Sequence, residues 1–385
     1  FDGRSMVEID YRELKIGSLF LVSGQTAQAF IAFGVNLVLV RYLTPEDFGR
    51  FALALAGVAL LCTLLSLQIN VLVIRVSESR FEEAAKDRYF NALLIETAVA
   101  GAVAICWLVV TNSLEPWSAG LVVAVGLRHW AHPNVAFFER SMPYRKLAFA
   151  ETASAMASHL LALALIVLGG SGVVLFIREY VLTLVTLAGL WMVGGITLRI
   201  PRLITVHEWR VLFHEARGVW LDCVLENSFQ RLVILLVGLL AGDRSVGFFF
   251  QAQRLAMVPN QFLAPILTRV AANWFGRTED ATTRRVGRNR ILLVVAGPLA
   301  CLGVLCVVFA DPIIPWLFGS TWASSAPLLA AMSGLVVFLS LFEVLKVYCW
   351  STERMGPLLK GRIIQHLGCA LPVAAVIGFS YPGGL

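Results

Sequence analysis

The sequence predicts an all-α protein that crosses a membrane many times, and both its composition and its apolar blocks lead to this prediction. Of the 385 residues, 58% are hydrophobic and 15% are charged, whereas a soluble globular protein has about 25% charged residues. The hydrophobic residues gather in blocks of about 20, the length that a helix needs to cross the hydrocarbon core of a bilayer. An outer-membrane barrel is excluded, because its strands alternate apolar and polar residues over about ten positions.

These blocks define eleven expected transmembrane spans. They cover residues 16–40, 50–73, 89–111, 117–139, 147–169, 172–197, 218–241, 245–274, 290–311, 324–348 and 359–380. Because eleven is odd, we expect either that a twelfth helix is missing or that one of these spans is wrongly split or merged. We therefore predict a polytopic protein with about 11–12 transmembrane helices, arranged in two six-helix halves around a central cavity.

The longest stretch between spans divides the chain into these halves. Residues 1–197 form the N-terminal half with spans one to six, and residues 218–385 form the C-terminal half with spans seven to eleven. Between them, residues 198–217 mix apolar and basic residues at roughly helical spacing, which predicts an amphipathic connector helix on the cytoplasmic membrane surface. Residues 40–51 and 240–250 are both short charged turns followed by Gly and an aromatic residue, which suggests a parallel repeat.

Basic residues in the loops are distributed unevenly between the two sides of this topology. The loops on the side of the N-terminus, together with the N-terminal segment, hold 22 Lys and Arg residues, whereas the other loops hold only Arg41, Arg50 and Arg244. Loops rich in Lys and Arg stay in the cytoplasm. The asymmetry therefore predicts a cytoplasmic N-terminus.

The turn between the first two spans carries a full set of helix-start signals. Thr44 can cap a helix whose first residue is Pro45, where a missing N–H costs no hydrogen bond. Asp47 follows Thr44 at the spacing of a capping box. Gly49 removes a side chain where two helices meet closely at the hairpin. A stable hairpin would by itself explain these residues, without any further function.

Three stretches resemble motifs of one transporter family. Residues 41–49, Arg-Tyr-Leu-Thr-Pro-Glu-Asp-Phe-Gly, resemble the R-x-L-x-P-x-x-F-G stretch after the first helix of polysaccharide-transport (Wzx-type) flippases, in the multidrug/oligosaccharidyl-lipid/polysaccharide exporter superfamily. Residues 245–254 with Pro259 resemble a second motif of this family, although Phe249 stands where Tyr is common. Residues 316–322 resemble its LfG-x-x-W loop before the tenth helix. The residues that we assign to the structural motifs are Arg41, Pro45, Gly49 and Gly247.

The resemblance implies a function in the export of lipid-linked sugars. The chain would translocate an oligosaccharide linked to polyprenyl pyrophosphate from the cytoplasmic to the outer face of the bacterial inner membrane, by alternating access, for surface polysaccharide biosynthesis. We expect a multi-pass monomer that is not an enzyme, needs no cofactor or metal and binds no nucleic acid. Its expected partners are the lipid bilayer and a polysaccharide polymerase with its chain-length machinery.

Charged residues inside the spans are candidates for substrate contact, because intramembrane charges are rare and costly. Arg128 and Arg254 lie near the middle of their spans in opposite halves, and arginine offers phosphate several donors in a fixed arrangement. We therefore expect a cationic cavity between the halves, with structural salt bridges as the alternative explanation. The candidate cavity residues are Arg128, Arg254, Arg231, Glu226, Arg178, Gln25, Gln28 and Gln251.

Other polar residues have structural interpretations. Glu343 and Lys346 lie three residues apart on one span and are close enough to pair with each other. Arg269, near an inner helix end, can extend its head group to the membrane surface. His129 and His132 are expected to line a pore or to pack, rather than to bind a metal.

Two other functions compete with export of a lipid-linked sugar. A drug or toxin antiporter of the same superfamily usually relies on a membrane carboxylate in its first helix, whereas the first span here carries glutamines and no carboxylate. A membrane glycan polymerase or ligase generally requires a large outer loop or paired catalytic carboxylates. The sequence shows neither a large outer loop nor paired catalytic carboxylates.

Overall fold

The structure, a computed structural model, describes residues 11–75, 82–139, 144–196, 199–277, 280–352 and 354–380, and its regular structure in these ranges is helical, without strands. The elements are α1 (Tyr11–Tyr42), α2 (Pro45–Leu65), α3 (Ile69–Arg75), α4 (Glu83–Val110), α5 (Pro116–Glu139), α6 (Tyr144–Val167), α7 (Val173–Met192), α8 (Val206–Arg277), α9 (Ala281–Phe318), η2 (Ser320–Trp322), α10 (Ser325–Ala331), α11 (Ser333–Ser351) and α12 (Met355–Ser380).

The helix α8 consists of two arms. Gly242 interrupts it with a φ of 75° and a ψ of 176°, a backbone conformation that glycine adopts without the steric penalty of a side chain. We call residues 206–241 the first arm and residues 243–277 the second arm. The chain therefore reverses direction inside the element, as the predicted turn at residues 240–250 requires.

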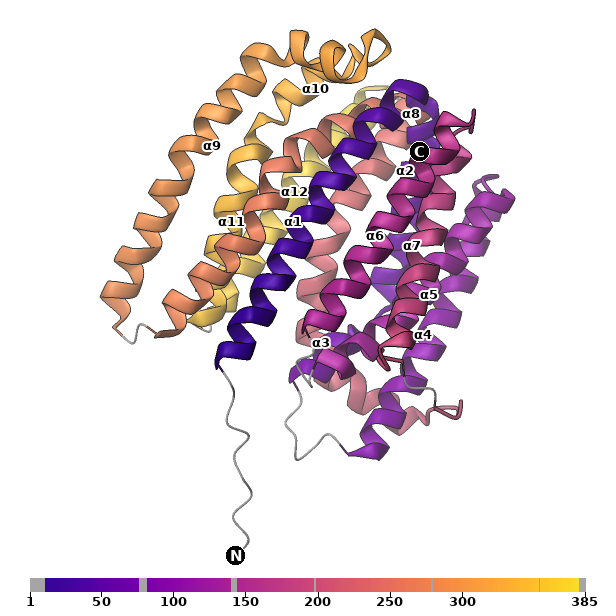
Figure 1. Cartoon of the computed structure of the whole chain (residues 1–385), viewed down its shortest axis with the longest axis vertical. Coiled ribbons are helices and arrows are strands. Elements are labelled where there is room, and N and C mark those ends of the chain that lie inside the picture. The colour runs from indigo at the N-terminus through magenta and orange to yellow at the C-terminus, as the bar shows by residue number, and fades with distance from the viewer. Residues whose placement is uncertain are drawn as a thin grey trace, which may run out of the picture.

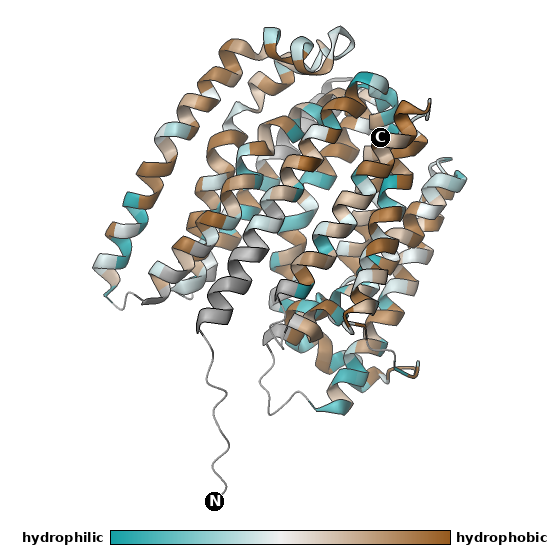
Figure 2. Cartoon of the chain, in the orientation of Figure 1, coloured by the Kyte–Doolittle hydropathy of each residue, from teal (hydrophilic) through white to brown (hydrophobic). Residues whose placement is uncertain are grey.

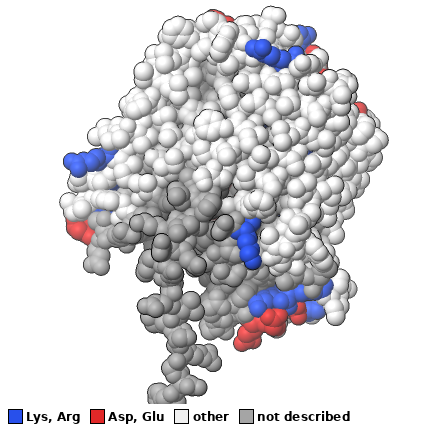
Figure 3. All heavy atoms as spheres, in the orientation of Figure 1, with Lys and Arg blue, Asp and Glu red and all other residues white. Residues whose placement is uncertain are grey.

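The long helices run between two ends of the molecule (Figure 1). We call the end at which α1 begins the basic end, and the end at which α1 passes into α2 the opposite end. Hydrophobic residues predominate along the lengths of the helices (Figure 2). On the face drawn in Figure 3, charged side chains are few and lie near the two ends. This distribution suits a bundle whose middle lies in lipid.

The structure confirms an all-α chain that is built to cross a membrane repeatedly. In the described part, seven helices are long and apolar enough to span a bilayer, and the two arms of α8 count there as a single helix. Each of the eleven expected spans overlaps a helix or an arm of a helix. The division into two six-helix halves and the twelfth helix stay predictions.

The second expected span differs from the structure. The sequence predicted one span over residues 50–73, but α2 ends at Leu65 and α3 begins only at Ile69. Between them, Ser66 has an extended backbone and Gln68 has a φ of 56°, in a region that non-glycine residues seldom adopt. The joint between α2 and α3 therefore turns the chain sharply near the basic end.

The connector also differs from the prediction, because the structure contains no separate helix over residues 198–217. The first arm of α8 begins at Val206 and continues past residue 217 without a break. The preceding residues 199–205 have no regular secondary structure. Arg199 ties them to α4 through ion pairs with Glu83 at 2.8 Å and with Asp87 at 2.5 Å. Whether the start of α8 lies on a membrane surface stays a prediction.

A capping box starts α8. The Glu208 carboxylate accepts the backbone N–H of Thr205 at 2.9 Å, and the Thr205 hydroxyl accepts the N–H of Glu208 at 3.3 Å. Arg202 donates to the same carboxylate at 2.7 Å. The hydrogen bonds from Arg202, followed by that from the Thr205 N–H, lower the pKa of Glu208 to about 2.

Candidate functional site

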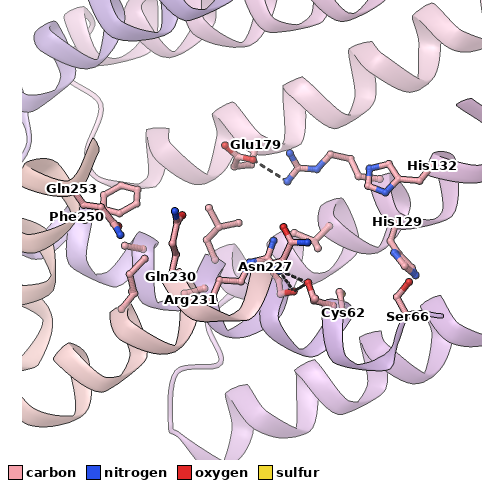
Figure 4. Close-up of a pocket in the computed structure, with 18 of the residues that line it drawn as sticks. Cys62, Ser66, His129, His132, Glu179, Asn227, Gln230, Arg231, Phe250 and Gln253 are labelled. Carbon is pink, nitrogen blue, oxygen red and sulfur yellow. Dashed lines mark hydrogen bonds and ion pairs between the residues drawn. The ribbon is translucent and has the colours of Figure 1, made fainter. Parts of the chain in front are cut away.

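A cavity of about 610 Å³ lies in the middle of the bundle. The helices α2, α5 and α7 line it from the first half of the chain, and both arms of α8 line it from the second half. The close-up in Figure 4 shows polar side chains from these elements pointing toward one another across the space. The predicted central cavity is therefore present in the structure, between segments far apart in the sequence.

Arg128 reaches this cavity from α5, as predicted, but it has a partner there. Its guanidinium lies 2.9 Å from a carboxylate oxygen of Glu179 on α7, and Arg178 lies 3.2 Å from the other oxygen. Glu179 lines the cavity, whereas Arg178 is buried behind it and packs on the ring of Phe51. Two arginines thus share one carboxylate, and this group keeps a positive charge.

Arg254 provides a second cation from the second arm of α8. It lines the cavity and packs on the ring of Phe250, with the guanidinium carbon 5.5 Å from the ring centre. Among the residues that the structure describes, Arg254 forms no ion pair. The charge of Glu179 also acts on Arg254, but Glu179 pairs directly with Arg128 and Arg178.

Arg231 provides the third cation, from the first arm of α8. It donates to the backbone oxygen of Ala59 at 2.9 Å and to the hydroxyl of Thr63, both on α2. These acceptors are neutral, so they orient the guanidinium without cancelling its charge. The described lining of the cavity thus holds three arginines against one carboxylate, which favours an anionic ligand.

Sequence reasoning missed most of the neutral polar residues of the lining. They follow helical spacing, which places them on one face of each arm of α8. A helical projection of the two arms around Arg231 and Arg254 would have found them. The missed residues are Asn227 and Gln230 in the first arm and Gln253 in the second arm, whereas Gln261, which the sequence had suggested as a sugar contact, does line the cavity.

Several predicted cavity residues lie elsewhere. Gln28 donates to the Thr152 hydroxyl on α6 at 3.0 Å and is absent from the cavity lining. Gln251 is buried and accepts a hydrogen bond from Asn36 at 3.0 Å, so it joins α8 to α1 instead of facing the cavity. The side chain of Gln25 lies outside the described residues.

Glu226 also lies outside the cavity, in a second cluster of charges, which we call the acid–base cluster. It pairs with Lys346 of α11 at 3.1 Å and with Arg362 of α12 at 3.0 Å. Lys346 also pairs with Glu343 at 2.7 Å, as the sequence predicted, and Arg362 lies 3.0 Å from Asp222. Three carboxylates and two cations thus largely neutralise one another.

The three stretches with family motifs meet at the opposite end, where they form what we call the seal. Arg41 donates to the backbone oxygens of Trp316 and Leu317 at 2.9 and 3.1 Å. The buried indole of Trp322 donates to the backbone oxygen of Val40 at 2.8 Å. Its rings pack edge-on against Phe48, Phe248 and Phe318.

Two glycines allow the backbones of the seal to touch. A Cβ atom on Gly49 would collide with the backbone oxygen of Asp243, and one on Gly247 would collide with that of Pro45. The sequence predicted a close approach at Gly49 within the first hairpin, but the partner is the second arm of α8. The predicted capping box of Thr44 and Asp47, with Pro45 at the start of α2, is confirmed.

The sequence is similar to proteins of bacterial polysaccharide synthesis. A family model described as "Polysaccharide biosynthesis protein" matches residues 38–327. The succinoglycan biosynthesis transport protein ExoT of Rhizobium meliloti (strain 1021) is 24% identical over 81% of this chain and 64% of its own length. The lipopolysaccharide biosynthesis protein WzxC of Escherichia coli (strain K12) is 32% identical over 29% of this chain and 23% of its own length. The chain thus covers less than two thirds of each relative.

Solved structures share the fold. An inward closed conformation of the lipid II flippase MurJ superposes with a TM-score of 0.67, at 10% identity, over 89% of this chain and 78% of the MurJ chain. An inward-facing multidrug resistance transporter of the MATE family superposes with a TM-score of 0.54, at 14% identity, over 93% of this chain and 98% of that chain. At these low sequence identities, the structural similarity establishes only the fold of this chain and not its function.

Proposed function

The chain belongs to this polysaccharide biosynthesis protein family, and from that premise we propose that it flips a polyprenyl-pyrophosphate-linked oligosaccharide from the cytoplasmic to the outer face of the bacterial inner membrane. The product would serve surface polysaccharide synthesis. The observation that carries the proposal is the cavity between the two halves, which three arginines and one carboxylate line. A fold shared with a lipid II flippase is consistent with such a cargo.

The chemistry of the cavity suits this cargo. A pyrophosphate group carries negative charge on adjacent phosphates, and a guanidinium can donate two parallel hydrogen bonds to a phosphate. Arg254 forms no direct ion pair among the described residues, so it would be the principal contact. The amides of Gln230 and Gln253 can donate to and accept from sugar hydroxyls. The polyprenyl chain would stay in the bilayer.

The direction of transport follows from the positions of the seal and the basic loops. The basic end would face the cytoplasm, because its loops carry most of the Lys and Arg residues. The seal would then close the outer side, so the described conformation would receive cargo from the cytoplasm. With the cytoplasm negative, outward movement of an anion is favoured by about 2.3 kcal/mol per charge per 100 mV.

Export would require the seal to open and the basic end to close around the same cavity. The chain would act as a transporter without catalytic activity, as a monomer, and would deliver its cargo to a polymerase with chain-length machinery. The second arm of α8 carries both Gly247 of the seal and Arg254 of the cavity. Movement of this arm would therefore couple opening of the seal to exposure of the bound pyrophosphate.

The decisive experiment replaces Arg254 in a strain that lacks the chromosomal gene. Arg254→Ala should abolish surface polysaccharide and trap lipid-linked repeat units on the cytoplasmic face, while Arg254→Lys should retain part of the function. Loss of a charged hydrogen bond of about 1.5–3 kcal/mol weakens binding about ten- to one-hundred-fold. Binding of a prenyl pyrophosphoryl sugar to purified protein measures this loss.

Two controls make the experiment interpretable. Arg210→Ala replaces an exposed arginine of the same helix and should leave both surface polysaccharide and binding unchanged. All variants must reach the membrane at the level of the unmodified protein. Normal polysaccharide in the deletion strain, without a redundant transporter, would contradict the proposed function. Increased drug susceptibility of that strain would instead favour the antiporter.

A further inference from the structure

A buried carboxylate and an imidazole face each other behind the wall of the cavity. Glu96 lies on α4 with its side chain 4% exposed, and His129 lies on α5 with its side chain 13% exposed. Their nearest atoms, Oε2 of Glu96 and Nε2 of His129, are 3.8 Å apart. His129 also lines the cavity. Nothing in the proposed binding of pyrophosphate uses Glu96, so this pair needs its own explanation.

The carboxylate is held in place by the joint between α2 and α3. Its other oxygen, Oε1, accepts the backbone N–H of Leu67 at 3.2 Å. Oε2 of Glu96 and Nε2 of His129 are both buried and have no hydrogen-bond partner among the described residues. A distance of 3.8 Å is too long for a hydrogen bond. The two atoms therefore face each other with unused capacity, and a small movement of either would join them.

The charged and titratable groups around the pair come from three elements, α5, α7 and the first arm of α8. His132, on the same face of α5, has its ring centre 6.4 Å from that of His129. Arg128, the neighbour of His129, is paired with Glu179 of α7. Arg231 of the first arm of α8 donates to Thr63 of α2. Within the described part of the chain, Glu96 has no ion-pair partner other than His129.

These surroundings limit the protonation states of the pair. An isolated ionised carboxylate is too costly to keep in an apolar interior, and such a group is either paired or neutral. The resting pair therefore holds one proton, on either the imidazole or the carboxylate. A second proton gives an imidazolium beside a neutral carboxyl and raises the charge at the cavity wall by one.

We propose that Glu96 and His129 form a proton-binding site that controls how tightly the cavity holds an anionic ligand. The identity of that ligand as a pyrophosphate rests on the proposed function. The proton comes from water in the cavity through His129, forms an N–H or O–H bond on the pair, and returns by the same route. Because linkage is reciprocal, proton binding strengthens anion binding and anion binding draws in a proton by the same factor.

The geometry also connects this site to the backbone at the edge of the cavity. The N–H of Leu67 is free to bond with Glu96 because α2 has already ended at Leu65. A protonated carboxyl is a weaker acceptor than a carboxylate, so a proton on Glu96 loosens this anchor. Ser66 and Gln68, on either side of Leu67, line the cavity. Protonation thereby changes the restraint on the joint as well as the charge.

The first test measures linkage in purified protein in lipid nanodiscs. The probe is a short-chain prenyl pyrophosphoryl sugar, a diester whose phosphates stay ionised across the pH range. Calorimetry in buffers of different ionisation enthalpy should show uptake of up to one proton per bound probe. The affinity should rise at least about fivefold on acidification from pH 8 to pH 5.5, the lower end of typical couplings. Glu96→Gln and His129→Gln should each abolish most of the uptake.

The control variant is His366→Gln. His366 is a partly buried histidine of α12 that contacts Ser228 and lies outside the cavity lining, so its replacement should leave proton uptake unchanged. Unchanged uptake in both Glu96→Gln and His129→Gln would overturn the proposal. Circular dichroism and size-exclusion chromatography establish that each variant is folded.

A second measurement tests the pair without any ligand. Infrared spectra at acidic pH should show a protonated carboxyl band that is absent from Glu96→Gln and shifted in His129→Gln. A band that persists unchanged in Glu96→Gln would overturn the proposal. If the probe fails to bind at any pH while this band behaves as expected, the proposed function is wrong and the proton site stands.

Discussion

The first arm of α8 carries charged residues on two faces, and the two faces hold them differently. Toward α11 and α12, Glu226 pairs with Lys346 at 3.1 Å and with Arg362 at 3.0 Å. Toward the cavity, Arg231 bonds only to neutral oxygens of α2. One face therefore neutralises its charges, and the other orients a charge and leaves it intact.

The difference shows that a membrane charge can be interpreted only together with its partner. Arg362 and Arg254 are both arginines inside the second half of the chain, but Arg362 lies between Asp222 and Glu226, and Arg254 packs on an aromatic ring. The first arrangement holds helices together. The second provides a charge that an arriving anion can use.

The largest effect on stability should come from the acid–base cluster. Arg362→Ala would leave Asp222 and Glu226 without their common cation, and removal of one partner from a buried ion pair costs about 3–5 kcal/mol. Thermal unfolding in detergent should show a strongly lowered midpoint, while Arg254→Ala should leave the midpoint nearly unchanged. If Arg362→Ala unfolds at the normal midpoint temperature but loses export, Arg362 takes part in transport. The contrast between a structural cluster and a functional cavity would then be wrong.

The next effect should appear in ligand affinity, with opposite signs for two partners. Arg128→Ala removes a cation from the cavity and should weaken binding of a prenyl pyrophosphoryl sugar. Glu179→Gln removes the carboxylate that competes for Arg128, and it should strengthen binding by about 1 kcal/mol, roughly fivefold. Titration calorimetry of the folded fraction measures both. Weaker binding in Glu179→Gln would mean that this carboxylate contacts the cargo or positions the arginines.

A third test asks whether the cavity face becomes accessible when the seal fails. Gly247→Ala places a methyl group against the backbone oxygen of Pro45. Overpacking costs about 1–3 kcal/mol, which lowers the ratio of sealed to unsealed molecules about five- to one-hundred-fold. Labelling of Cys62, which lines the cavity, by an impermeant thiol reagent from outside should increase.

The matched control for this substitution is Gly297→Ala in α9, because a Cβ atom there meets nothing within 4 Å. Labelling of Cys62 should stay at its original level in this variant. Equal labelling of both variants would show that the glycine contact does not determine access to the cavity.

The smallest effect should come from the ion pair of Arg202 and Glu208 at the start of α8. The folded pKa of Glu208, about 2, lies below the ordinary value of about 4.3, so the contribution of this carboxylate is present above about pH 4.3 and is lost as the pH falls toward 2. Chemical unfolding should show that Glu208→Gln lowers stability slightly at pH 7 and that the difference shrinks near pH 3. The effect is small because water and salt screen exposed charges.

Much of the fold could be predicted because a bilayer restricts the possible structures. Long apolar blocks must become helices there, since each backbone polar group needs an internal partner. Hydrophobicity alone could not locate the end of α2 at Leu65, because residues 69–75 remain mostly apolar after the break. The joint depends on Glu96, which lies on another helix and accepts the Leu67 N–H.

The site could be predicted only in part, for the same reason. Arg128, Arg231 and Arg254 were identified because charges in apolar spans are conspicuous, and all three line the cavity. The same signal also selected Glu226, which lies in the acid–base cluster. Sequence position cannot say which face of the first arm meets which neighbour, since Glu226 and Asn227 are adjacent residues that point to different surroundings.

The reciprocal contacts of Gly49 and Gly247 are made with backbone oxygens, so they involve no side chain that a cargo could touch. The amides that would form hydrogen bonds with the sugar belong to Gln230 and Gln253 and lie on the cavity wall. Specificity for a new sugar could therefore evolve through substitutions in the wall while the closing device stays the same. Exchange of these amides between relatives with different sugars should transfer cargo preference without changing how the transporter closes.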